Sequence, residues 1–165
     1  MTRTVSCPTT ARALLADDRL VILATEATGR AIRAVALLDR HGHVLLHTRI
    51  RPACPDAPPR AVVWPPLAAL LTGRIVVSMH LARDRRLLRQ AARRLGATLM
   101  YSAWCSLAEL VDSGPRAAAC WDRAHPLPAS HAALAEAHAA LAALRVVAAP
   151  PLTVPPSRHV FWRYL

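Results

Sequence analysis

The feature that most constrains the fold is a series of short apolar runs rich in β-branched residues. Three of them follow one another early in the chain, at Leu20–Leu23, Ile32–Leu38 and Val44–Ile50, and the turn Asp39–Gly42 separates the second from the third. Runs of this kind bounded by turn residues are typical of strands, and an antiparallel meander is their simplest arrangement. A fourth run of the same type, Ile75–Met79, follows a proline-rich segment.

Helical patterns alternate with strand patterns in the rest of the chain. An arginine-rich helix is expected from about residue 82 to Leu95, with its apolar side chains on one face and Gly96 closing it. A second helix, rich in alanine, is expected from a cap at Ser130 to about Arg145. Shorter elements complete the prediction: helices at 11–16, 67–71, 106–111 and 117–123, a fifth strand at 98–104, and a proline-rich loop at 51–66. The alternation predicts an α/β fold.

Length and composition predict one globular domain over residues 1–147. The chain has 165 residues, of which 54% are hydrophobic, so it can bury a substantial core. It has neither a run of about 18 apolar residues nor a signal segment, and we therefore expect a cytoplasmic protein with no membrane partner. Its four cysteines are scattered, as reduced thiols would be. Residues 148–165 form a proline-rich linker and an aromatic, basic tail, which packs on its own domain or docks on a protein partner.

The charge balance favours a polyanionic partner. The formal net charge is +11, and all 21 basic residues other than histidine are arginines. An excess of this size favours phosphate contacts, because they release counterions. The arginines of the helix at 82–95 form either a solvated face or a nucleic-acid-binding surface, for which Arg83, Arg86 and Arg89 are the candidates.

Several acidic and basic side chains are candidates for a hydrolytic centre. Phosphodiester hydrolysis by two metals needs carboxylates that converge on ions about 4 Å apart, and a base for the attacking water. Positions 24 and 26 share a face of the first strand, yet they hold Ala24 and Glu26, so only one can bind a cation. Asp84, His131 and Glu136 begin the two long helices. Each of these residues also has a simpler interpretation, as a solvated strand end, a helix-dipole partner or a surface side chain.

Four segments in order make the chain resemble a known family. They are Val21–Gly29, which contains Ala-Thr-Glu-Ala-Thr-Gly; the strand and turn at Ala34–Leu45; Leu67–Leu88, which contains Asp84; and Ser130–Ala137. Together they resemble the DnaQ-like, DEDDh 3′-5′ exonucleases. The resemblance implies a ribonuclease H-like fold with a mixed five-stranded sheet flanked by helices. It also implies cleavage at DNA or RNA 3′ ends with Mg²⁺ or Mn²⁺ as the cofactor.

Carried over by position, the resemblance implies specific roles. Glu26 and Glu136 would be metal ligands, Asp84 would hold metal-bound water, and His131 would be the general base. Ala24 stands where the family has the aspartate that bridges both ions.

Further departures accompany Ala24. Glu136 is longer than the usual aspartate, and His80 and Arg83 replace the usual Asn and Phe near Asp84. The segment before Leu67 is short and lacks the His-Gly-Ile sequence of the family. These departures predict an exonuclease-family protein whose activity is impaired or absent.

Two other hypotheses stay open, a non-catalytic nucleic-acid-binding module and a structural subunit that docks a partner through its tail. Smaller signals are interpreted as structural. His41, His43 and His47 are expected to be solvated or structural histidines, and the four tryptophans are expected mostly in the core, at Trp64, Trp104, Trp121 and Trp162.

Overall fold

Five strands form one mixed sheet in the order β3-β2-β1-β4-β5. The computed structural model describes residues 10–51, 55–101, 103–111 and 132–149. The strands are β1 (Leu20–Thr28), β2 (Ala31–Asp39), β3 (Val44–Arg49), β4 (Ile75–Ser78) and β5 (Ala103–Ser106). β1, β2 and β3 pair antiparallel, whereas β4 pairs parallel with β1 and β5 parallel with β4. The expected α/β class, and a mixed sheet whose first three strands are antiparallel, are thereby confirmed.

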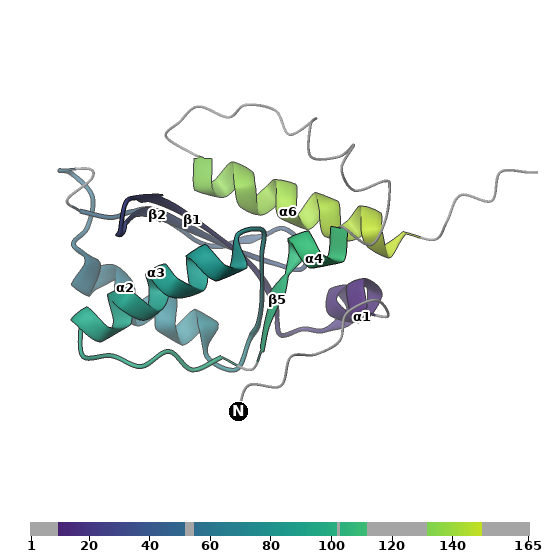
Figure 1. Ribbon diagram of the computed structural model, residues 1–165, viewed down its shortest axis with the longest axis horizontal. Coiled ribbons are helices and arrows are strands. Elements are labelled where there is room, and N and C mark those ends of the chain that lie inside the picture. The colour runs from purple at the N-terminus through teal and green to yellow at the C-terminus, as the bar shows by residue number, and fades with distance from the viewer. Residues whose placement is uncertain (1–9, 52–54, 102, 112–131, 150–165) are drawn as a thin grey trace, which may run out of the picture.

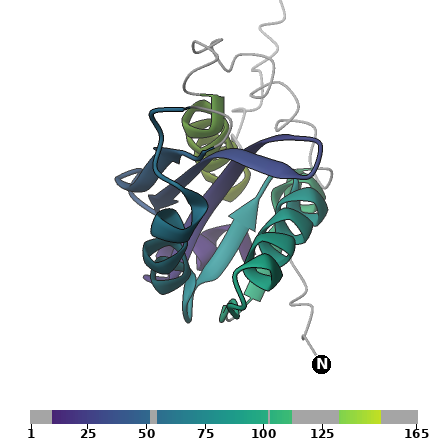
Figure 2. The same ribbon diagram turned by 90° about the vertical axis from the view of Figure 1, so that its left-hand side faces the viewer.

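Helices cover both faces of the sheet (Figure 1). They are α1 (Thr10–Ala16), α2 (Arg60–Leu71), α3 (Leu81–Arg94), α4 (Leu107–Val111) and α6 (Ala132–Ala148). On one face α6 lies over β1 and β2 and packs against α1 and α4, while α2 and α3 share a core with the other face. Figure 2 shows this arrangement from the side, with α6 at the top and α3 at the right.

Alternation along β1 explains why both faces of the sheet are covered. Ile22 and Ala24 belong to the core beneath α6, whereas Val21 and Leu23 belong to the core beneath α2 and α3. On the α6 side the facing residues are small: Ala133, Ala137 and Ala140 of that helix are buried in the same core as Ala24. Side chains of this size let α6 lie close to the strand, so the interface leaves little room for anything larger at position 24.

The prediction of a loop at 51–66 is wrong in its last part, because α2 begins at Arg60 and contains Pro65 and Pro66. Prolines inside a helix remove two amide donors and leave the carbonyls of Ala61 and Val62 without their usual helical partners. All four residues are exposed, so water can satisfy those carbonyls. The opposite side of the helix is apolar and buried, through Val63, Trp64, Leu67 and Leu71. Burial of that face outweighs the proline signal.

Other elements lie close to their predicted positions. The fifth strand is shorter and later than expected, at Ala103–Ser106, and a short helix follows it directly. Trp64 is buried and Trp104 packs against the core, as predicted. No helix within the described ranges is long and apolar enough to cross a membrane. The predicted helix at 117–123, the cap at Ser130, three of the cysteines and the tail from residue 150 lie outside the described residues.

Candidate functional site

The end of β1 places one carboxylate, not two, at the candidate site. Ala24 is 1% exposed and is part of the hydrophobic core. Glu26 is partly exposed, and its Oε1 lies 4.0 Å from the Nε of Arg33 on β2. The β1–β2 register shifts just beyond Glu26, at the step to Ala27. Of the two positions on this strand that bind metal in the family, one is apolar here and the other pairs with an arginine.

Asp84, in the first turn of α3, is completely buried. Its Oδ1 accepts a hydrogen bond from Thr25 Oγ1 at 2.7 Å, and its Oδ2 accepts one from Ser78 Oγ at 2.6 Å. Thr25 belongs to β1 and Ser78 is the last residue of β4, so one carboxylate joins the ends of two strands to a helix. Ser78 Oγ also accepts a hydrogen bond from the backbone amide of His80 at 3.1 Å, which holds the loop between β4 and α3.

Arg83 brings the remaining acidic residue into the same network. Its Nε donates to Asp84 Oδ1 at 3.0 Å, and its Nη2 donates to the Thr25 carbonyl at 3.0 Å. The same Nη2 lies 3.3 Å from Oε1 of Glu136, near the start of α6. The guanidinium therefore lies between the two carboxylates and ties β1, α3 and α6 together.

Two carboxylates share this one guanidinium, so negative charges outnumber positive ones when both are ionised. Beside burial, this excess contributes to a raised pKa of Glu136. Burial raises the pKa of Glu136 to about 7, with Arg83 opposing the shift and the Asp84 carboxylate adding to it. His80 Nε2 lies 3.7 Å from Glu136 Oε1, so a protonated His80 would supply a second positive charge. Near neutral pH a proton on Glu136 can therefore balance the charge of the cluster.

The described residues do not fit the two-metal centre that the family resemblance implies. They contain no group of three or more His, Cys, Asp or Glu side chains that could hold a metal ion. Both oxygens of Asp84 are already hydrogen-bonded, and Glu136 faces a guanidinium. Asp84 and Glu136 are brought together, as predicted, but around Arg83. His131, the implied general base, lies outside the described residues.

The three arginines predicted to bind nucleic acid separate into two groups. Arg83 is held inside the network with Asp84 and Glu136. Arg86 and Arg89 are exposed and line a groove beside α3, which they share with Arg30 from the β1–β2 turn. Sequence reasoning missed Arg30, since nothing in the local pattern around a turn indicates which helix lies opposite.

Sequence reasoning also missed the partners of Asp84. Thr25 and Ser78 are ordinary strand residues until β1 and β4 are known to pair in parallel, with Leu20 opposite Ile75. Parallel pairing brings the carboxyl ends of both strands to one edge of the sheet, where the first turn of α3 also lies. The only signal in the sequence was a hydroxyl at each strand end, and that pattern is common.

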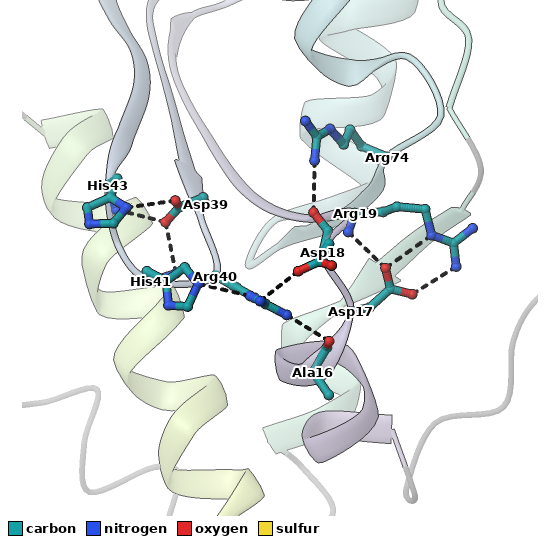
Figure 3. A network of polar contacts seen from close by, with 9 residues as sticks. All are labelled: Ala16, Asp17, Asp18, Arg19, Asp39, Arg40, His41, His43 and Arg74. Carbon is teal, nitrogen blue, oxygen red and sulfur yellow. Dashed lines mark hydrogen bonds and ion pairs between the residues drawn. The ribbon is translucent and has the colours of Figure 1, made fainter.

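A second polar network lies at the opposite end of β1 and organises turns (Figure 3). Arg19 binds both carboxylate oxygens of Asp17, and these hydrogen bonds hold the pKa of Asp17 at about 2. Asp39 accepts hydrogen bonds from the backbone amides of His41 and His43, and its Oδ2 lies 2.9 Å from the His43 ring. Both histidines are exposed, which agrees with the structural role expected for them.

Comparison of the sequence with protein-family models and with curated proteins finds no match. The geometry of the described residues is therefore the main basis for a functional assignment.

Proposed function

We propose that this chain is a nucleic-acid-binding protein related to the DnaQ-like 3′-5′ exonucleases, in which metal-dependent cleavage has been lost. The α/β architecture, with three antiparallel strands followed by two parallel ones, is compatible with the ribonuclease H-like fold that the sequence motifs imply. The motif positions Glu26, Asp84 and Glu136 lie at or near one edge of such a sheet: at the end of β1, in the first turn of α3 and near the start of α6.

The position of the Arg83 guanidinium is the observation that carries the loss of cleavage. Its Nε lies 3.0 Å from Asp84 Oδ1, and its Nη2 lies 3.3 Å from Glu136 Oε1. The resemblance assigns both of these carboxylates to metal binding. A guanidinium compensates carboxylates as a cation does, and it does so with fixed, planar hydrogen bonds. Arg83 therefore takes over the electrostatic role of an ion at this edge of the sheet.

A guanidinium cannot take over the chemical role of a metal. A catalytic ion generates the nucleophile by lowering the pKa of bound water, and it stabilises the leaving oxygen as a Lewis acid. Arg83 has no open coordination position, and Ala24 contributes no ligand beside it. The described residues thus keep the charge balance of a hydrolytic centre but lack the means to activate water.

Binding is supported by the charge of the whole chain and by its distribution. A net charge of +11 favours a polyanion, and Arg86 and Arg89 are exposed on α3, the helix that also carries Asp84. We therefore assign the chain a nucleic-acid partner, with DNA and RNA both as candidates.

The test measures cleavage and binding separately on a single-stranded oligonucleotide labelled at its 5′ end. The chain is incubated with Mg²⁺ or Mn²⁺, beside Ala24→Asp and the double variant Ala24→Asp, Arg83→Leu, with folding checked by circular dichroism. We expect salt-dependent binding and no release of mononucleotides by the unchanged chain. The double variant is the one form in which a carboxylate is added and the guanidinium is removed, so any recovery of cleavage is expected there first.

Two outcomes would overturn the proposal. If the unchanged chain releases mononucleotides, and a Glu26→Gln, Glu136→Gln preparation does not, the chain itself is an exonuclease. If the chain has no affinity for DNA or RNA at low salt, the binding role is refuted. The docking role of the tail would then be the remaining hypothesis.

A further inference from the structure

A basic groove runs along α3 and is lined from the other side by Gly29 and Arg30 of the β1–β2 hairpin. Figure 2 shows the end of this hairpin near α3. The volume of the groove is about 540 Å³. The polar side chains that line it are five arginines and one glutamine, namely Arg30, Arg85, Arg86, Arg89, Gln90 and Arg93. No acidic and no aromatic side chain is among its lining residues.

A tight turn places Arg30 opposite the helix. β1 ends at Thr28 and β2 begins at Ala31, so the hairpin loop is only Gly29 and Arg30. Gly29 has a φ of 59°, a value that glycine adopts without strain, and this permits the two-residue turn. The hairpin therefore adds a positive charge from the sheet to those from α3.

The groove arginines keep their charge available. None of the five forms an ion pair with a carboxylate of the described residues, whereas Arg19, Arg33, Arg40 and Arg83 all do. Arg89 donates a hydrogen bond from its Nη2 to the Tyr101 hydroxyl at 3.3 Å, and this partner is not a carboxylate.

The spacing of the arginines suits one phosphate backbone. Residues 85 to 93 cover about 12 Å along a helix that rises ~1.5 Å per residue. Each strand of a DNA duplex carries one phosphate per ~3.4 Å of its axis, so the helix spans at most about three or four phosphates, and fewer of an extended single strand. A volume of about 540 Å³ is within the range of pockets that hold one small molecule, so the groove takes a short segment of one strand. Without an aromatic platform it offers no stacking surface for bases.

We propose that this groove binds the phosphate backbone of single-stranded nucleic acid without reading the bases. The inference deepens the proposed function and rests on it. Arg85, Arg86, Arg89 and Arg93 contact successive phosphates from one side, and Arg30 contacts them from the hairpin. Because the groove begins at Ala82, beside Arg83, a strand in it lies next to the network around Asp84.

Two adjacent arginines provide a matched test. Arg93 and Arg94 are both exposed in the last turn of α3, but only Arg93 lines the groove. Fluorescence anisotropy with a labelled oligo(dT) of about a dozen nucleotides, a length within the site range of single-strand binders, gives the affinity over a salt series. Arg93→Gln and Arg94→Gln remove the same charge, so any difference between them reflects position and not net charge.

The magnitude follows from counterion release. Each single-strand phosphate contact contributes about 0.7 to the magnitude of the slope of log affinity against log salt concentration. Over the tenfold range from roughly 1 M to 0.1 M salt, one contact therefore raises the affinity about fivefold. We expect Arg93→Gln to lose about that much and Arg94→Gln less than twofold. The double variant Arg86→Gln, Arg89→Gln is expected to lower the slope by about 1.4, with equal effects on oligo(dT) and oligo(dA).

The groove and the proposed function fail in different ways. Unchanged binding by the groove variants, beside normal binding by the wild-type chain, would refute the groove and leave nucleic-acid binding intact. Tighter binding of a duplex than of a single strand would refute the single-strand assignment. Absence of binding by the wild-type chain at low salt would overturn both.

Discussion

Replacing Asp84 distinguishes a structural carboxylate from a metal ligand. Asp84 is fully buried, and it accepts hydrogen bonds from Thr25, Ser78 and Arg83. In Asp84→Asn the bonds from Thr25 and Arg83 both end on Oδ1, which the amide keeps as an oxygen. The amide nitrogen would face Ser78 Oγ, a hydroxyl that can also accept. All three pairs of atoms can stay in contact in this variant, but the charge is lost and the bond with Ser78 reverses direction, which leaves the buried Ser78 hydroxyl hydrogen without this acceptor.

The two substitutions at this position therefore differ in cost. A hydrogen bond to a charged group is worth about 1.5–3 kcal/mol and a neutral one about 1 kcal/mol, so we expect Asp84→Asn to lower the free energy of unfolding by about 2 kcal/mol. Asp84→Ala leaves two buried hydroxyls without their acceptor and removes one partner of an ion pair, for which about 3–5 kcal/mol is expected. A loss of that size is a large part of the stability of a typical domain.

Urea unfolding followed by far-ultraviolet circular dichroism measures both values, with and without millimolar Mg²⁺ or EDTA. Asp56→Asn and Asp56→Ala serve as controls, because Asp56 is exposed. We expect the order wild type, Asn, Ala in decreasing stability, with no response to metal or chelator. If Asp84→Asn is neutral or stabilising, and Mg²⁺ protects only the wild-type chain, Asp84 is a metal ligand under electrostatic strain and the reasoning is refuted.

The remaining predictions concern Glu136, Ala24 and Gly42. The pKa of Glu136 lies near 7 instead of 4.5, so the folded protein binds this proton more tightly and stability falls as pH rises between those values, by at most about 3 kcal/mol. Glu136→Gln removes this contribution, so its urea midpoint should depend less on pH over that range than the wild-type midpoint does. An equal pH dependence in the two proteins would contradict the prediction. Ala24→Leu overpacks the buried contact with α6 and costs about 1–3 kcal/mol in the same assay, whereas an unchanged midpoint would show that the interface has spare room. In Gly42→Ala the new Cβ lies 3.3 Å from Leu141 at a φ of 96°, so we expect a larger loss of thermal stability than in Gly96→Ala, where the Cβ meets nothing; equal losses would count against the contact.

Much of the fold could be predicted from local pattern. The strand at Ile32–Leu38 was expected from its β-branched residues and is observed as Ala31–Asp39. The arginine-rich helix was expected at 82–95 and is observed at Leu81–Arg94, because its apolar side chains recur at helical spacing. The beginning of α2 at Arg60 was not predictable in this way, since two prolines argue locally against a helix that tertiary burial nevertheless stabilises.

Of the candidate site residues, the structure brings Asp84 and Glu136 into one network, in an arrangement that the sequence did not predict. Asp84 and Glu136 were singled out by position in family-like motifs, and the structure brings them together. The sequence could not reveal that the arginine next to Asp84 would turn inward and lie between them. Its direction depends on contacts with β1 and α6, and in both cases Arg83 and its partner are more than fifty residues apart in the sequence. The same limit applies to Arg30, whose role depends on the helix opposite the hairpin.

The arginine at the centre of the site differs from an ion in one lasting respect, which is that it is covalently part of the chain. A bound metal depends on its concentration in the surroundings and leaves when a chelator competes for it. The guanidinium of Arg83 is present in every copy of the protein, at a fixed ratio to Asp84 and Glu136. The contacts that join β1, α3 and α6 are therefore independent of metal supply, and this edge of the sheet can form during folding without waiting for a ligand.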